Sequence, residues 1–248
     1  MALLAPSGRG IQLTDQGKEF YGKAHLFLQQ EQDLLSLNLV KSATFRIGTF
    51  EVFSTYLIPG HWNKYLPQHE LELRELLPGH MEAALVNDEI DLAITYEPIP
   101  TAGLDFLKIG KIPMGIFAKA NVFVNLELKK IPFVAPVTPI NAIPSGSKGL
   151  DGWPDDKVSR NVKYRADMLE SGLALARNGD AAIFMPVFLA MLHNENTNPS
   201  RRLVEISHAG QFRTVYRDVY LVKRKSSAEG ELIKKVSRLI RTECLNRN

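Results

Sequence analysis

The sequence is poor in the residues that build disulfide frameworks and membrane spans. It has 248 residues and a single cysteine, Cys244, so no disulfide forms within the chain, and a reducing compartment is expected. No apolar run is long enough to cross a bilayer. The first ten residues lack the basic segment and apolar stretch of a signal peptide. We therefore expect a cytoplasmic chain with no transmembrane segment.

Side-chain patterns for catalysis or metal binding are also lacking. The six histidines are scattered, with no His-x-x-x-His pair and no cysteine pair, so a zinc site has no support. Gly146, Gly149 and Gly152 do not have the spacing of a dinucleotide fingerprint. The sequence contains no Gly-x-Ser-x-Gly elbow and no Walker loop. It predicts no enzyme, no cofactor and no metal site.

The overall composition is that of an ordinary globular protein. Hydrophobic residues make up 45% and charged residues 23% of the chain, which suits one large domain or two small ones. The formal net charge of +3 is too small to identify a nucleic-acid binder, because clustering of charge matters more than its sum. The terminal helix carries Lys234, Lys235, Arg238 and Arg241, which suits an exposed helix face better than a phosphate-binding one.

The N-terminal region predicts one long helix. Thr14 is a suitable N-cap, and Asp15 lies in the first turn, where the helix dipole favours negative charge. No proline interrupts the chain from there to about Lys41, and Phe20 and Phe27 belong to an apolar series with helical spacing. The helix either forms a dimer or packs on its own domain, and we favour dimerisation.

After Ser42 the pattern changes to alternating strands and helices, which predicts a parallel sheet with right-handed crossovers. A second α/β set follows a segment rich in proline, glycine and serine, so we expect two lobes with a ligand cleft between them. Strands are predicted at 45–49, 70–76, 90–95, 104–118 in two pieces joined at Ile112-Pro113, 133–135, 161–165, 181–185 and 213–223. Helices are predicted at 51–69, 81–88, 169–178, from Pro186 as the opening residue, and at 228–245.

Four stretches together resemble LysR-type transcriptional regulators. The segment Gly8 to Tyr21 is similar to the family's junction between its winged helix-turn-helix and its linker helix. The other stretches resemble the family's sensing domain: Arg46-Ile-Gly-Thr with Leu57-Ile-Pro59 and Leu66-Pro67, then Glu89-Ile-Asp-Leu-Ala-Ile, then Gly172 to Pro186. No single stretch is specific, but their order and separation are those of the family.

The resemblance implies a two-lobed α/β effector domain of the type 2 periplasmic-binding-protein kind, preceded by a linker helix. On this basis residues 1–13 are the remnant of a DNA-binding wing and 14–41 the linker and dimerisation helix. Residues 42–118 with 219–248 form lobe I, and residues 119–218 form lobe II. Most of the helix-turn-helix is absent, so operator DNA is expected to be contacted through a head largely outside this chain, with Arg9 as the DNA-binding residue that remains.

The family's effector site lies between the lobes, where strands end and helices begin. Glu51 would oppose an anion there, so either the effector is neutral or cationic or the cleft is filled by Phe50 and Phe53. Glu51 could instead stabilise its own helix. Mapped onto this chain, the expected effector-binding residues are Thr49, Phe50, Glu51, Val52, Gly79, His80, Thr95, Tyr96, Pro136, Val137, Ala166 and Asp167.

Several of these positions have a structural alternative. Gly79 could serve a simple turn, His80 could be an exposed residue at a helix start, and Tyr96 could be buried against the hinge. Asp167 has the residue type and place of an N-cap for the helix at Leu169. Asp91, from the Ile-Asp-Leu-Ala-Ile stretch, is expected to fix a helix-to-strand turn. We hypothesise that Thr49, Tyr96, Pro136 and Asp167 converge on one cleft.

The resemblance implies a bacterial regulator in which a small molecule shifts a homodimer or homotetramer and thereby transcription. A solute-binding protein of the periplasmic type is the alternative. It would share the lobes, but it would be exported and would have no use for the helix beginning after Thr14.

Overall fold

The computed structural model describes residues 2–7, 10–36, 44–137, 149–195, 197–206, 215–227 and 230–245. The chain divides into two compact units, Met1–Ala43 and Thr44–Asn248. Within the described residues, no helix is long and apolar enough to cross a membrane.

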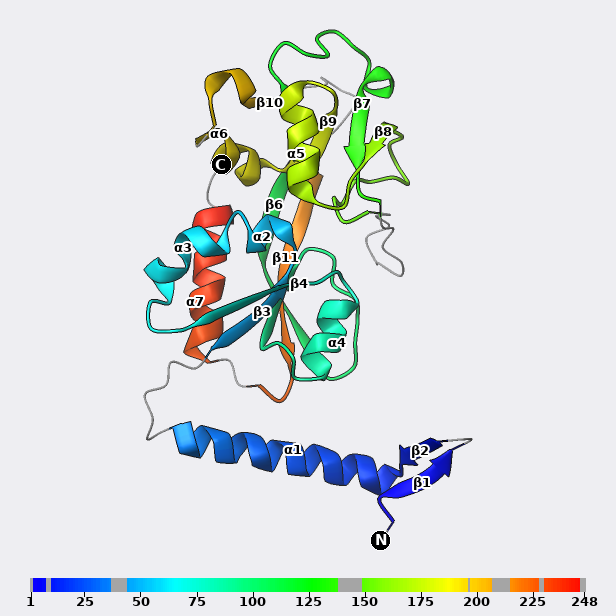
Figure 1. Cartoon of the computed structure of the whole chain (residues 1–248), viewed down its shortest axis with the longest axis vertical. Helices are drawn as coiled ribbons and strands as arrows, with labels where there is room; N and C mark the ends of the chain where they lie inside the picture. The colour runs from blue at the N-terminus through cyan, green and yellow to red at the C-terminus, as the bar shows by residue number, and fades with distance from the viewer. Residues whose placement is uncertain are drawn as a thin grey trace. The chain divides into compact units, whose positions relative to one another are not determined.

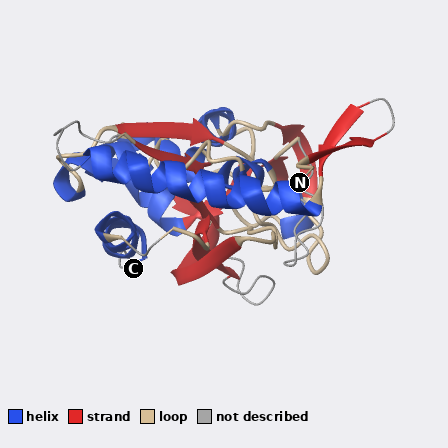
Figure 2. Ribbon diagram, turned by 90° about the horizontal axis from the view of Figure 1, so that it is seen from below, coloured by secondary structure: helices blue, strands red, loops and turns tan. Residues whose placement is uncertain are grey.

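The first unit is a hairpin followed by a long helix. Strands β1 (Leu4–Ser7) and β2 (Gly10–Leu13) pair antiparallel. The helix α1 (Asp15–Ser36) runs without interruption for 22 residues (Figure 2). Thr14 caps it as predicted, because its Oγ1 accepts a hydrogen bond of 2.9 Å from the amide of Gly17. The predicted extension to Lys41 lies outside the described residues.

The second unit is built on one mixed sheet in the order β4-β3-β5-β11-β6-β9-β7-β8, with β10 paired to β6. Its first half contains the parallel strands β3 (Phe45–Thr49), β4 (Leu71–Glu75) and β5 (Leu92–Thr95). Helices α2 (Glu51–Ser54) and α3 (Ile58–Tyr65) connect β3 to β4, and α4 (His80–Val86) connects β4 to β5. This is the predicted β-α-β-α-β order.

The predicted helix 51–69 is two helices. A turn separates α2 from α3, and Pro59 lies in the first turn of α3, where its missing N–H costs no helical hydrogen bond. Pro59 therefore begins a helix instead of interrupting one.

Two long strands join the halves of the sheet. Strand β6 (Leu104–Lys119) pairs first with β11 (Val215–Arg224) and then with β9 (Ala182–Pro186). The prediction of two separate pieces broken at Ile112-Pro113 is wrong. Pro113 lies where β6 changes its neighbour from β11 to β9, since pairing with β9 begins at Met114. A strand accommodates proline best where its pairing is interrupted.

The second half holds β7 (Pro132–Ala135) and β8 (Asn161–Arg165) beside β9. Helix α5 (Leu169–Asn178) has the predicted bounds, and α6 (Val187–Glu195) begins directly after Pro186, which ends β9. Short turns η1 (Leu128–Lys130) and η2 (Pro199–Arg201) and strand β10 (Leu203–Glu205) complete this half. Figure 1 shows α5 and α6 beside these strands, with β6 and β11 leading to the other half.

The chain then returns along β11 to the first half. Helix α7 (Glu231–Ile240) is shorter than predicted, because its last turn widens into the π-helical segment η3 (Arg241–Leu245). Figure 1 shows α7 beside α3 on one side of β3 and β4, with α4 on the other.

A polar network ties the first half together. Asp91 accepts a 2.8 Å hydrogen bond from the backbone amide of Arg46, and its other oxygen lies 2.7 Å from the Arg46 guanidinium. Arg224 of β11 lies 2.9 Å from Asp88 and donates to the carbonyl oxygens of Leu85 and Ile90. These bonds confirm the structural role predicted for Asp91, since it fixes the turn before β5 against β3.

Candidate functional site

A cavity of about 70 Å³ lies between the two halves of the sheet unit. A single water needs about 10–15 Å³, so the cavity holds a few waters or a very small ligand. Phe50 and Tyr96 line it from the first half, and Pro136 and Asp167 line it from the second. The predicted site residues that it brings together are Phe50, Glu51, Val52, Tyr96, Pro136, Ala166 and Asp167.

The hydroxyl residues predicted at strand ends face the core. Thr49 is fully buried, and its hydroxyl donates a hydrogen bond of 2.8 Å to the carbonyl oxygen of Ile94. Thr95 is also buried, and its hydroxyl accepts a hydrogen bond from the amide of Glu97. Of the four residues hypothesised to converge, Tyr96, Pro136 and Asp167 line one cavity, whereas the Thr49 side chain fastens β3 to β5.

Gly79 and His80 begin α4 and do not line this cavity. Gly79 has a φ of +94°, which favours glycine, and its amide donates a 2.6 Å hydrogen bond to the carboxylate of Glu82. His80 is exposed at the start of the helix. Gly79 therefore matches its simple-turn alternative, and His80 matches the alternative of an exposed residue at a helix start. Arg9, the remaining predicted site residue on the N-terminal side, lies outside the described residues.

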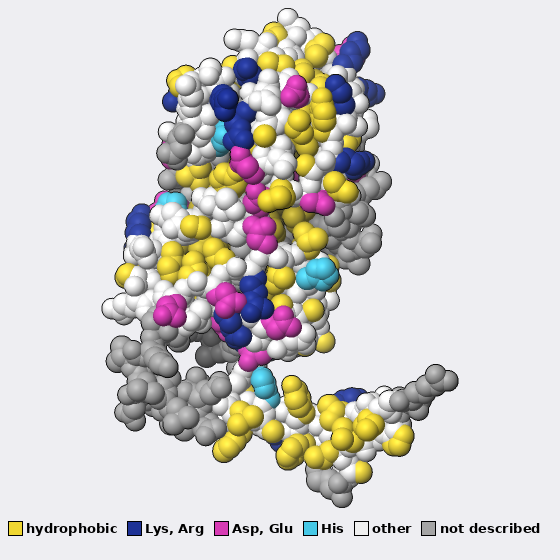
Figure 3. All heavy atoms as spheres, in the orientation of Figure 1, with side chains coloured by type: hydrophobic (Ala, Val, Ile, Leu, Met, Phe, Trp, Pro, Cys, Tyr) yellow, Lys and Arg dark blue, Asp and Glu magenta, His cyan; other side chains and the backbone are white. Residues whose placement is uncertain are grey.

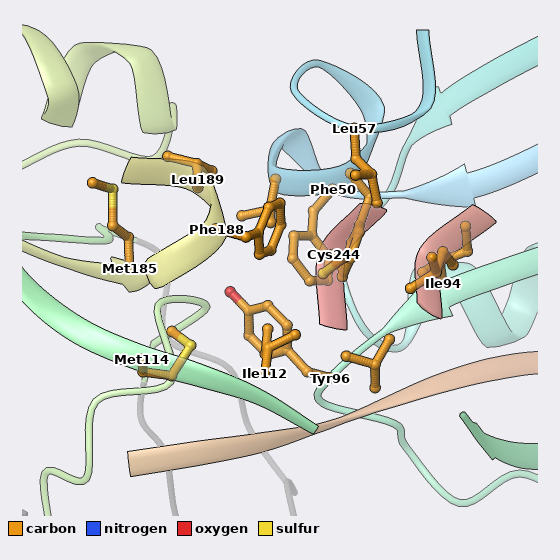
Figure 4. Packing of buried hydrophobic residues seen from close by; sticks show 14 of the residues in the cluster. Phe50, Leu57, Ile94, Tyr96, Ile112, Met114, Met185, Phe188, Leu189 and Cys244 are labelled. Atoms are coloured by element: carbon orange, nitrogen blue, oxygen red, sulfur yellow. The ribbon is translucent and has the colours of Figure 1, made fainter. Parts of the chain in front are cut away.

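Aromatic rings occupy the base of the cleft. Phe50 meets Tyr96 edge to face, with ring centroids 4.7 Å apart, and lies 5.4 Å from Phe53. Phe53 in turn packs against Phe188 of the second half, with the ring centroids 6.4 Å apart. All four rings are buried. Figure 4 shows three of them, Phe50, Tyr96 and Phe188, among the side chains of the core. Phe50 and Tyr96 therefore form the floor of the cleft without filling it, since both also line the cavity.

The Tyr96 hydroxyl is already engaged. It donates a hydrogen bond of 2.8 Å to the carbonyl oxygen of Leu150, and burial raises the pKa of the phenol. Asp151, beside Leu150, pairs with the buried guanidinium of Arg160. Tyr96 thus joins the end of β5 to Leu150, which also lines the cavity, and it is buried as one alternative predicted, while its ring still lines the cavity.

Glu51 lies in the first turn of α2, as one alternative predicted, and its carboxylate contacts the opposite half. One carboxylate oxygen accepts a 2.5 Å hydrogen bond from the amide of Leu169, and the other accepts one of 2.9 Å from the amide of Glu170. These amides open α5, so the carboxylate lies where the helix dipole and the unpaired N–H groups favour negative charge. The sequence does not predict this contact between Glu51 and α5.

A second polar contact joins the halves beside it. The Tyr56 hydroxyl donates to Glu170 on α5, and Arg177 pairs with the other oxygen of the same carboxylate. Burial and the bond to Glu170 raise the pKa of Tyr56. Burial tends to raise the pKa of Glu170, but the bonds from Tyr56 and Arg177 outweigh it and hold that pKa below its ordinary value. Glu170 is therefore a charged acceptor between two donors.

Asp167 does not cap α5. Its Oδ1 accepts a hydrogen bond of 2.8 Å from the amide of Val137, and the residue preceding the helix is Met168, whose side chain makes no cap bond. The prediction of an N-cap at Asp167 is wrong, because Glu51 holds the first amides. Val137 itself is exposed and lies on the outer side of the second half, beside Arg160 and Arg165.

The outer part of the cleft forms a second space of about 200 Å³. Phe50, Glu51 and Asp167 line it together with residues that the sequence did not single out, namely Glu75, Leu76, Leu77, Leu150 and Met168. Glu75 could have been found: it ends β4 opposite Thr49 in the parallel register, and carboxyl ends of neighbouring parallel strands share one edge of a sheet. Leu150 and Met168 lie in loops and carry no such signal.

The family is decided by a comparison with protein-family models. Residues 40–245 match the model of the LysR substrate binding domain. The chain belongs to this family. Its fold is accordingly the predicted one, a type 2 periplasmic-binding-protein-like α/β domain, here preceded by α1. It carries the effector-binding domain of a LysR-type regulator.

Solved structures of regulators share this LysR-domain fold. Full-length OxyR from Pseudomonas aeruginosa is 17% identical, with a TM-score of 0.66 over 96% of this chain and 80% of that chain. LysG from Corynebacterium glutamicum, solved with its effector arginine bound, is 15% identical, with a TM-score of 0.63 over 98% and 82%. A putative transcriptional regulator from Vibrio parahaemolyticus is 21% identical, with a TM-score of 0.61 over 82% and 94%. A comparison with curated protein sequences finds no match.

The LysR domain of this chain offers neither a reactive thiol nor a recognisable metal cluster among its described residues. Cys244 is 1% exposed, and burial raises the pKa of its thiol, so the nucleophilic thiolate is suppressed. No group of three or more histidine, cysteine, aspartate or glutamate side chains in the described ranges could hold a metal ion. The cleft itself presents ring faces, backbone groups and carboxylates, which are groups that can bind a ligand non-covalently.

Proposed function

We propose that this chain is the effector-sensing and oligomerisation region of a LysR-type transcriptional regulator. The observation that carries the proposal is the cleft whose walls come from both halves of the domain, with Phe50 and Glu51 on one side and Pro136 and Asp167 on the other. A ligand seated there contacts both halves, so its affinity depends on how they are arranged. Such differential affinity is what allows a ligand to shift an equilibrium between two states.

The two halves act as lobes I and II in this proposal. Residues 42–118 and 219–248 make up lobe I, residues 119–218 make up lobe II, and β6 and β11 connect them. Rotation about these strands would change the cleft while leaving each lobe's core intact. The surrounding oligomer would respond to that rotation, which is how effector binding would reach transcription.

The effector is neutral or cationic in this proposal. The carboxylates of Glu51, Glu75 and Asp167 line the outer cleft with apolar side chains, and Glu51 already holds the amides that an anion would use. LysG was solved with arginine, a cation, as its effector. A ligand with an ammonium or guanidinium group and an apolar part would satisfy both features of the outer cleft.

The N-terminal unit supplies self-association and the link to DNA. Helix α1 exposes Phe20, Tyr21, Phe27 and Leu28, each more than half accessible, and apolar side chains cover much of the visible face of this unit (Figure 3). An exposed apolar patch of this kind marks an interaction site. The β1–β2 hairpin would be the end of a DNA-binding wing, with Arg9 reaching operator DNA. A free solute-binding protein has no use for such a helix, which favours the regulator.

Thermal unfolding of the purified chain against a ligand panel tests the proposal. The panel should contain amino acids, polyamines and aromatic acids, so that cationic, neutral and anionic compounds are compared. A ligand present at one hundred times its Kd stabilises a protein by about 2.7 kcal/mol, which raises the Tm measurably. We expect a response among the cationic or neutral compounds, and no response anywhere in the panel would count against a sensor of these metabolites.

A further inference from the structure

The N-terminus of α5 already holds an anion, and that anion belongs to the chain. The first amides of a helix have no partner within the helix, and they attract negative charge. Here the Glu51 carboxylate accepts hydrogen bonds from two of them, those of Leu169 and Glu170. It reaches them across the interlobe cleft from 118 residues away in the sequence.

We propose that Glu51 is the specificity-determining residue of the cleft: it substitutes for an anionic ligand at α5 and thereby restricts the site to neutral or cationic effectors. This rests on the proposed function, since it concerns the charge of the ligand in that same cleft. An incoming carboxylate would have to displace Glu51 from the amides and leave it in the cleft without those partners. A cationic ligand would leave the hydrogen bonds of Glu51 intact and would be attracted to its carboxylate.

The surroundings of Glu51 strengthen the exclusion of anions. Glu75 and Asp167 line the same outer cleft, and Glu170 lies one residue beyond Leu169 on α5. Arg177 is paired with Glu170. An anion entering the outer cleft would therefore meet repulsion from the carboxylates that line it.

The same contact fastens the lobes to each other. Glu51 belongs to α2 of lobe I, and the amides belong to α5 of lobe II. A second hydrogen bond, from Tyr56 to Glu170, also joins the two lobes. Phe50, which precedes Glu51, is fixed by its ring contact with Tyr96. In a domain that binds an anion at this helix, the ligand would connect the two lobes. In this chain the Glu51 carboxylate connects them without a ligand.

Removing Glu51 should create a site for small carboxylates. The probe is sodium acetate, with sodium chloride at equal ionic strength as the reference, and the readout is the Tm of the full chain. Glu51→Ala leaves the amides of α5 open, so we expect acetate to raise its Tm by about 2–4 °C or more. Glu75→Ala is the matched control, because it removes a carboxylate from the same cleft without uncovering these amides, and its response to acetate should be much smaller than that of Glu51→Ala.

Two outcomes of the acetate titration would overturn the proposal. One is a folded Glu51→Ala chain whose Tm does not depend on acetate. The other is an equal acetate response in wild type and in both variants.

A measurement on the wild-type chain covers the case in which Glu51→Ala does not fold. The amides of Leu169 and Glu170 should exchange with solvent roughly tenfold or more slowly than unprotected amides, since each donates to a charged acceptor. Exchange at the unprotected rate would overturn the proposal. Neither test requires a known effector, so failure to find an effector and failure of the Glu51 assignment are separate results.

Discussion

Phe50 and Tyr96 meet edge to face beneath the cleft, with their ring centroids 4.7 Å apart and their planes at 78°. Phe50 directly precedes Glu51, and Tyr96 directly follows β5, so this contact joins the ends of two parallel strands to the floor of the site. The floor is therefore a packed aromatic cluster, and ligand space lies mainly outside it.

Phe50→Ala should destabilise the domain strongly. The ring is 4% exposed and packs against two other aromatic rings, and truncation of a buried phenylalanine costs about 3–5 kcal/mol. Urea unfolding followed by circular dichroism measures the loss. Tyr216→Ala is the control, because that ring is 59% exposed and its removal should change stability by only about 0.5 kcal/mol. A loss at Phe50 as small as at Tyr216 would contradict the packed floor.

Glu243 should make the domain sensitive to acid. Burial tends to raise its pKa, but hydrogen bonds from Lys64 and Tyr65 and the proximity of His61 hold the pKa below the ordinary value of 4.5. A lowered folded-state pKa adds stability that is present above pH 4.5 and lost as the pH falls through the folded value. Urea unfolding from about pH 7 down to about pH 3 should show a smaller loss for Glu243→Gln than for wild type.

The control for this acid dependence is Glu127→Gln. Its side chain is 66% exposed, so the pH profile of this variant should follow that of wild type. Identical profiles for wild type, Glu243→Gln and Glu127→Gln would show that Glu243 does not contribute.

Cys244 should not react in the native state. It is buried against the core, and burial raises its pKa, so a thiol reagent reaches it only when the segment opens. Labelling with a chromogenic disulfide should be slow in buffer and complete in urea. Rapid labelling of the native chain would contradict the buried position and would make a thiol-based response worth testing.

Helix α1 should hold two copies of the chain together. Phe20 and Phe27 are seven residues apart on one face and are 53% and 68% exposed. Replacing both by glutamate should convert a dimer to a monomer in sedimentation velocity experiments, because two like charges would be buried at the contact. The control, Gln16→Glu with Lys23→Gln, changes the net charge equally at exposed positions. Dissociation by the control, or none by the phenylalanine pair, would contradict dimerisation through this face.

The fold followed from local signals in the sequence. Helix α5 has the bounds that its periodicity predicted, since Gly179, with a φ of +90°, ends it by a local conformation that favours glycine. The motif from Glu89 to Ile94 likewise predicts the structural role of Asp91, which its bonds to Arg46 confirm. Such features depend on residues close in sequence or on recurring motifs.

The site was predictable only in part, because its decisive contacts are long-range. The segments 50–52, 95–96, 136–137 and 166–167 were identified from their positions at the ends of strands, and seven of their residues line the cavity: Phe50, Glu51, Val52, Tyr96, Pro136, Ala166 and Asp167. The partner of Glu51 lies 118 residues away, and no periodicity connects them. Asp167 has the residue type of an N-cap, yet a carboxylate from the other half occupies those amides. Which way Thr49 faces depended on the packing of the strand and not on its residue type.

An effector bound in the interlobe cleft should compete with a bulky side chain placed there. Calorimetric titration of the stabilising compound into wild type, Met168→Trp and Ala102→Trp tests this most directly. Met168 lines both the cavity of about 70 Å³ and the outer space of about 200 Å³, whereas Ala102 is exposed in a loop of the first half. We expect Met168→Trp to weaken binding strongly and Ala102→Trp to bind as wild type does. Unchanged affinity in a folded Met168→Trp chain would place the ligand elsewhere and contradict binding in the cleft.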